Sequence, residues 1–140
     1  MRDQPITRET VTDALRSRGI SPTRQRVEIA YALFEHGGHQ SADQILARVN
    51  AQQAETSKAT VYNTLKLFLE RQLIRELVVD PSRVFYDPNV APHHHFYDVV
   101  TGELTDIPAD GVSVHGLPPL PPGTVADAVD VIVRTRPASG

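Results

Sequence analysis

The feature that most constrains this chain is a change in hydrophobic spacing shortly after residue 70. Before that point apolar residues recur three or four positions apart, which is the spacing of an amphipathic helix. After it come short extended segments bounded by turn residues, which is typical of strands. The expected helices span residues 7–18, 22–35, 42–50 and 58–71, and the first expected strands span 74–79 and 83–87.

Local signals define the ends of these segments. Thr7, Ser41 and Ser57 are expected N-caps, and the second helix is expected to carry Pro22 in its first turn and to stop at Gly37. The apolar stripe of that helix is predicted to consist of Val27, Ala30, Tyr31 and Phe34. Asp80-Pro81-Ser82 is a good turn between the two strands. Four helices followed by this hairpin predict a winged helix-turn-helix.

The rest of the chain has a different pattern. Residues 88–92 form an expected linker, and expected strands at 93–100 and 103–107 flank a tight turn at Thr101-Gly102. The tract GLPPLPPG cannot sustain a helix, and an apolar strand at 128–135 follows it. We therefore expect an α+β protein with a winged-helix DNA-binding domain at 1–87. A small, β-rich α/β domain is expected at 88–140.

Composition excludes several classes of protein. The chain has no cysteine, so disulfides, thiolate zinc sites and a catalytic thiol are excluded. Residues 1–86 carry 12 Lys/Arg and 10 Asp/Glu, whereas residues 87–140 carry 2 and 7, so only the first part can face phosphates. No apolar run reaches the length of a membrane span, and the N-terminus does not read as a secretory signal. We expect a protein of the bacterial cytoplasm with no membrane partner.

The helix at 58–71 has the two faces that a DNA-reading helix needs. Val61, Leu65 and Phe68 share a narrow sector, which is the expected core face. The opposite side carries Ala59, Tyr62, Asn63 and Lys66, a mixture of a small residue, an aromatic ring, an amide and a cation. Such side chains can read base edges in the major groove. The alternative is a solvated surface with one tyrosine at the edge of the core.

Other polar residues complete a predicted DNA-binding face. The N-terminus of the same helix suits a phosphate, the second helix supplies backbone contacts, and Arg75 and Arg83 lie in the wing. The predicted DNA-binding residues are Thr23, Arg24, Arg26, Ser57, Lys58, Thr60, Tyr62, Asn63 and Lys66.

Three consecutive histidines mark the second part of the chain. On a strand, His93, His95 and Tyr97 share one face, and His94 and Phe96 share the other. With a two-residue turn, Val100 pairs with Glu103 and Tyr97 pairs with Asp106, which puts Asp106 on the His93/His95 face. Two imidazoles and a carboxylate predict a site for a first-row transition metal. The alternative is an exposed polar strand, and His36 and His115 are expected at the surface.

The run SKATVYNTLKLF resembles the recognition helix of the ferric uptake regulator superfamily. SPTRQRVEIAYALF and GGHQSADQI precede it in the same order and at the same spacing, and the likeness covers residues ~10 to ~107. The stretch NVAPHHHFYDVVTGELTDIP and the ending GLPPLPPGTVADAVDVIVR resemble the iron response regulator branch. This resemblance implies a winged helix at 1–87 and, at 88–140, a module for dimerisation and for metal or haem sensing. It also implies a regulatory metal site where the two meet.

The resemblance also implies ligands. The metal site would comprise His39, Asp87, His93, His95 and Asp106, and haem would be bound by His93, His94 and His95. The ion would be Fe²⁺, Mn²⁺ or Zn²⁺, and a haem-synthesis enzyme is a further implied partner. Relatives usually hold a structural zinc with CxxC pairs, but Asp98 and Thr101 stand in the first pair here, so that zinc is not expected. Many relatives carry arginine where this chain has Asn63, so its base preference should differ.

The sequence thus predicts an iron-responsive repressor of iron and haem metabolism genes that binds AT-rich palindromic operators as a homodimer. The first alternative is a peroxide sensor, or a manganese or zinc sensor, in the same fold. A metalloenzyme using His93, His95 and Asp106 is a third class, but no activated nucleophile or acid/base pair is visible, so no enzyme is expected.

Overall fold

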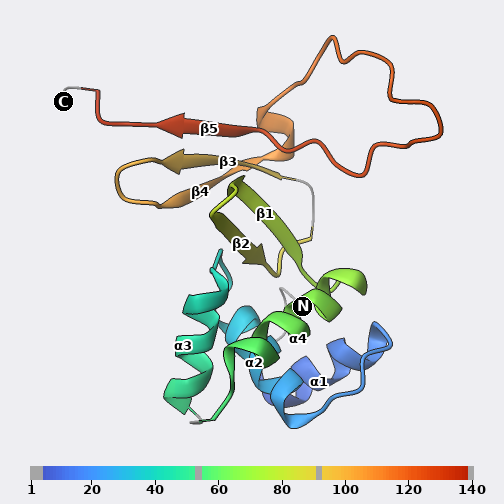
Figure 1. The fold of residues 1–140 in the computed structure, drawn as a ribbon, viewed down its shortest axis with the longest axis vertical. Coiled ribbons are helices and arrows are strands. Elements are labelled where there is room, and N and C mark those ends of the chain that lie inside the picture. Colours follow the sequence, from blue (N-terminus) through green and yellow to red (C-terminus); the bar gives the residue numbers. More distant parts are fainter. Residues whose placement is uncertain (1–4, 53–54, 91–92, 139–140) are drawn as a thin grey trace. The chain divides into compact units, whose positions relative to one another are not determined.

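A computed structural model describes residues 5–52, 55–90 and 93–138. It divides the chain into two compact units, Met1–Val90 and Ala91–Gly140, which are taken one at a time below (Figure 1). Part of the expected linker, residues 91–92, and the first four residues of the N-terminus lie outside the described residues. Within the described stretches, no helix combines the length and apolar character needed to span a bilayer.

The first unit is helical and ends in a hairpin. Its elements are α1 (Arg8–Ser17), α2 (Arg24–His36), α3 (Ala42–Gln52), α4 (Lys58–Glu70), β1 (Arg75–Asp80) and β2 (Arg83–Asp87), and β1 pairs antiparallel with β2. Thr7 caps α1 and Ser57 caps α4, each by accepting a hydrogen bond from a backbone N–H three residues later. This order of helices and hairpin confirms the predicted winged helix-turn-helix. The helix starts could be predicted because capping signals act over one helical turn.

The second helix differs from the prediction in two ways. It begins at Arg24 and not at Pro22, because Thr23 is the N-cap and accepts from the Arg26 N–H. Its buried residues include Ile29, Ala30 and Leu33, whereas three members of the predicted stripe, Val27, Tyr31 and Phe34, are only half-buried. The predicted stripe does pack against the core, but it is incomplete. Because α2 contacts α1, α3 and α4, it buries additional residues such as Ile29 and Leu33. 

The core of this unit joins all four helices. Its members with no more than 1% exposure are Val11, Leu15, Ile29, Ala30, Leu33, Ile45, Val61, Leu65 and Phe68. Burial of the last three confirms the predicted core face of α4. That burial fixes the rotation of α4 and therefore determines which side chains the helix exposes.

The second unit is a three-stranded sheet with an irregular crossover. Its elements are β3 (His93–Asp98), β4 (Leu104–Pro108), the 3-10 turn η1 (Ala109–Gly111) and β5 (Ile132–Thr135), in the order β4-β3-β5. β4 is antiparallel to β3 and β5 is parallel to it. Between η1 and β5 the chain forms no helix, as the proline tract predicted, and β5 is shorter than the expected strand at 128–135.

The register of β3 and β4 corrects the sequence prediction. Tyr97 pairs with Leu104, and Asp106 pairs directly with His95. The turn is longer than two residues because the Asp98 carboxylate accepts the N–H groups of Val100 and Thr101. These hydrogen bonds, led by that of Thr101, lower the pKa of Asp98. The shift is two residues, and side chains alternate with period two, so Asp106 stays on the predicted face.

Candidate metal-binding residues and DNA-binding face

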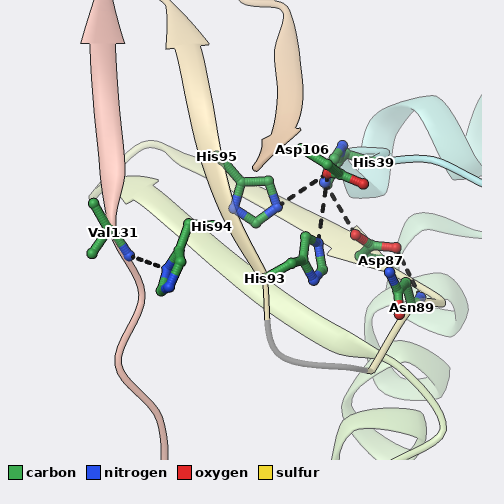
Figure 2. A network of polar contacts seen from close by, with 8 residues as sticks. All are labelled: His39, Asp87, Asn89, His93, His94, His95, Asp106 and Val131. Carbon is green, nitrogen blue, oxygen red and sulfur yellow. Dashed lines mark hydrogen bonds and ion pairs between the residues drawn. The ribbon is translucent and has the colours of Figure 1, made fainter. Parts of the chain in front are cut away.

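The first unit holds one pair of metal-type ligands, the His39–Asp87 pair. His39 Nε2 lies 3.1 Å from Asp87 Oδ2, and both side chains are at least nine-tenths buried (Figure 2). Asp87 Oδ1 accepts the Asn89 N–H at 2.8 Å. That bond fixes the carboxylate orientation and leaves Oδ2 turned toward the imidazole.

Backbone pairing explains why these two residues meet. Gln40 and Tyr86 form an antiparallel bridge in which each N–H donates to the other's carbonyl. The same register puts His39 opposite Asp87 as the adjacent pair without hydrogen bonds, where side chains lie closest. Sequence reasoning named both His39 and Asp87 as candidate ligands, but it missed Gln40, which pairs with Tyr86, and Asn89, which donates to Asp87.

The second unit holds the His93–His95–Asp106 cluster. Asp106 Oδ1 lies 3.6 Å from His93 Nε2 and 3.5 Å from His95 Nε2. Both histidines are buried, their ring centroids are 4.5 Å apart, and the Asp106 side chain is half-exposed. The prediction that these three residues share a face is therefore confirmed.

The spacing of these atoms suits a small metal ion. A tetrahedral ion with bonds of about 2.1 Å separates its ligand atoms by roughly 3.4 Å, and an octahedral ion separates adjacent ones by about 3 Å. The distances of 3.1 Å in the His39–Asp87 pair and 3.5–3.6 Å in the cluster match these values. Imidazole together with carboxylate is a donor set for divalent transition metals.

The middle histidine of the run, His94, faces the side of β3 opposite to His93 and His95. His94 is buried, and its Nδ1 accepts the Val131 N–H at 3.0 Å, just before β5 begins (Figure 2). Its Nε2 is therefore the nitrogen that carries the proton in the neutral ring. His94 ties the parallel strand to β3 from the side opposite the cluster.

The outer face of α4 is open, as predicted. Ala59, Tyr62, Asn63 and Lys66 are all exposed, and 44% of Tyr62 is accessible. Ser57 is engaged in the N-cap with Thr60, so its hydroxyl is already used within the helix. Lys58 lies 3.6 Å from Asp43 and 5.7 Å from the centre of the Tyr62 ring.

The remaining predicted DNA-binding residues lie at the start of α2. Thr23 and Arg24 are exposed, and Arg26 donates to the Ser21 carbonyl at 3.1 Å. In the wing, Arg83 is exposed and Arg75 is half-exposed. These cations are accessible, which a phosphate contact requires.

Comparison with known proteins agrees with this architecture. A profile of the ferric uptake regulator family matches residues 17–115. The chain belongs to the ferric uptake regulator family. The peroxide-responsive repressor PerR of Staphylococcus epidermidis is 30% identical over 93 residues, which cover 66% of this chain and 62% of the relative. The chain thus spans less than two thirds of the length of that curated relative.

Solved structures of the family share the fold. The Vibrio cholerae ferric uptake regulator has a TM-score of 0.69 at 16% identity, covering 89% of this chain and 98% of the other. The Pseudomonas aeruginosa ferric uptake regulator with manganese has a TM-score of 0.68 at 19% identity, covering 91% and 97%. At such identities the likeness concerns the fold alone.

The sequence reasoning did not single out Tyr86. This residue is buried and, together with Tyr62, lines an open groove of roughly 360 Å³. Burial, and then the charges of Glu76 and Tyr62, raise the pKa of Tyr86. Tyr86 directly precedes Asp87 in β2, so it lies between the His39–Asp87 pair and the groove that Tyr62 lines. No local sequence signal distinguishes it from an ordinary core tyrosine.

Proposed function

We propose that this protein is a metal-responsive transcriptional repressor that binds DNA as a homodimer. The observation that carries the proposal is that each unit of this fold places buried histidine side chains beside an aspartate at a spacing that suits a metal ion. The first unit also presents an open α4 face with Tyr62, Asn63 and Lys66.

DNA binding is assigned to the first unit. Tyr62 and Asn63 face the base edges in the major groove, whereas Lys66, Lys58 and the arginines at the start of α2 contact phosphates. The Lys58–Asp43 pair is highly exposed, so Lys58 can exchange this partner for a phosphate at little cost.

The metal is assigned to five ligands from both units: His39, Asp87, His93, His95 and Asp106. The ligand atoms of each group are already spaced for one ion, and the ion is Fe²⁺, Mn²⁺ or Zn²⁺. When bound, a divalent ion supplies a link between ligands of both units. The protein's own part is to hold these imidazoles and carboxylates close together, with the histidine side chains buried.

A homodimer accounts for the exposed apolar surface of the second unit. Among the described residues, this unit buries only Tyr97 and Ile107 as hydrophobic side chains. Nine of the twelve exposed large hydrophobic residues belong to it: Phe96, Val99, Val100, Val114, Leu117, Leu120, Val125, Val129 and Val133. A unit of this size cannot be stable with so small a core, and we assign its cover to a second copy.

The regulated genes follow from the resemblance noted in the sequence. We propose control of iron and haem metabolism through AT-rich palindromic operators. Haem on the three histidines belongs to the same proposal. His94 Nδ1 is already bonded to Val131, so haem would take its Nε2.

A peroxide sensor is the second candidate, and likeness to a peroxide-responsive repressor favours it. Iron-loaded protein treated with hydrogen peroxide would then gain one oxygen atom on His39, His93 or His95, as read by peptide mass spectrometry. An unmodified set of histidines after loss of DNA binding would exclude this candidate.

The deciding experiment is a DNA shift assay with a duplex that the wild-type protein enriches from a random pool. We expect binding with Mn²⁺ that falls steeply with salt and is lost with a chelator. His39→Ala and His95→Ala, one from each unit, should each abolish tight Mn²⁺ binding and the shift. If each variant still binds one Mn²⁺ ion tightly, the ligands form two separate sites and the proposal of one shared site is wrong.

A further inference from the structure

The loop that carries His39 begins with two glycines, whose backbone is less restricted than that of other residues. It begins at Gly37, which ends α2 with a left-handed φ of +74°, and Gly38 follows. Two glycines give the backbone more freedom than other residues would. His39 comes next, so its position depends on whatever fixes the chain immediately after it.

Gln40 fixes that chain in two directions. Its N–H donates to the Tyr86 carbonyl at 3.1 Å, and its carbonyl accepts the Tyr86 N–H at 2.7 Å. Its side-chain Nε2 donates to the Ala32 carbonyl of α2 at 3.2 Å, and the residue is 1% exposed. The loop is therefore attached to β2 by its backbone and to α2 by a side-chain amide.

The stability of the fold does not explain why residue 40 carries a side-chain amide. Ala32 lies inside α2, where its carbonyl already has a helical partner. Gln40 Oε1 is buried and has no hydrogen-bond partner among the described residues, which carries a free-energy cost. An apolar side chain of the same length would remove that cost and leave no backbone group unsatisfied.

We infer that Gln40 is a positioning residue for the metal ligands, because its amide anchors the loop to α2 and so holds His39 opposite Asp87. This inference rests on the proposed role of His39 and Asp87 in metal binding. Residues that orient a ligand in this way typically change metal affinity by ten- to a hundredfold when they are replaced.

The test is Gln40→Met in the full chain, which keeps the length and removes both polar atoms. We expect Mn²⁺ affinity, measured by calorimetry, to fall about tenfold. The urea midpoint of the metal-free protein should not fall, because the variant also removes the unsatisfied Gln40 Oε1. With Co²⁺ as the probe, the visible absorption bands should change, because the ligand geometry is no longer fixed.

Two outcomes would overturn the inference. Unchanged Mn²⁺ affinity would show that Gln40 does not position His39. A joint fall in affinity and in the metal-free urea midpoint would show a structural role only. Gln52→Met, at the exposed end of α3, is the matched control and should match wild type in both measurements.

A further variant separates this inference from the function on which it rests. Asp87→Ala removes a ligand itself and should lower Mn²⁺ affinity more than Gln40→Met does. If Asp87→Ala binds Mn²⁺ as wild type does, the metal assignment of this pair fails. If Asp87→Ala lowers Mn²⁺ affinity but Gln40→Met leaves it unchanged, the metal assignment stands and the positioning role of Gln40 fails.

Discussion

Replacing Tyr62 with alanine tests the assignment of α4 to base reading. The ring is 44% exposed in the free protein. With a tyrosine surface of roughly 200 Å², about 90 Å² is available for burial against thymine methyl groups and base edges. At about 25 cal/mol per Å², this burial contributes about 2 kcal/mol, or about thirtyfold in affinity.

The assay is a fluorescence anisotropy titration with Mn²⁺, using the enriched duplex and a scrambled duplex of equal length. Tyr62→Ala should lose about thirtyfold on the enriched duplex and much less on the scrambled one. Tyr62→Phe keeps the ring and should stay close to wild type. Lys66→Ala should weaken both duplexes alike and reduce the salt slope by about one.

Equal losses of Tyr62→Ala on the two duplexes would refute base reading by this ring. The result is interpretable because Tyr62 lies on the open face of α4, away from the buried Val61, Leu65 and Phe68. Circular dichroism should show the same helical content in the variant and in wild type.

Three further predictions concern the second unit. Asp106→Ala removes a half-exposed carboxylate from the cluster, so Mn²⁺ affinity should fall with the fold intact, and unchanged affinity in calorimetry would remove Asp106 from the ligand set. His94→Ala removes the acceptor of the Val131 N–H, so hydrogen exchange at Val131 should accelerate and haem absorbance should decrease while Mn²⁺ binding persists; equal loss of Mn²⁺ would contradict the two-faced strand. Phe96→Asp places a charge on the exposed apolar surface and should shift sedimentation from dimer to monomer, whereas an unshifted dimer would place the interface elsewhere.

The parts of the fold that the sequence predicted are those set by local chemistry. Ser57 accepts the Thr60 N–H and begins α4, and Gly37 ends α2 in the left-handed conformation. Each signal acts within one turn of the helix, so a single sequence is enough to read it. The exposed face of α4 could be predicted from the residue at which the helix begins and from the helical repeat.

The errors arose where distant segments meet. The burial of Ile29 and Leu33 depends on helices that approach α2 from several sides, which periodicity does not reveal. The β3–β4 register is the exception, because it depends on a local contact: the Asp98 carboxylate extends the turn by accepting the Val100 and Thr101 N–H groups. Gln40 could not be singled out from the sequence, because its bridge partner Tyr86 lies far along the chain.

The histidine run shows how one local rule separates two roles. β3 pairs regularly with β4 from His93 to Tyr97 and with β5 from His95 to Asp98, so adjacent side chains must point to opposite faces. His93 and His95 therefore meet Asp106, while His94 accepts a hydrogen bond from Val131, just before β5 begins. A replacement at His94 acts first on the attachment of β5, and a replacement at its neighbours acts first on the cluster. The middle histidine thus has a structural reason to be present that does not depend on any bound ligand.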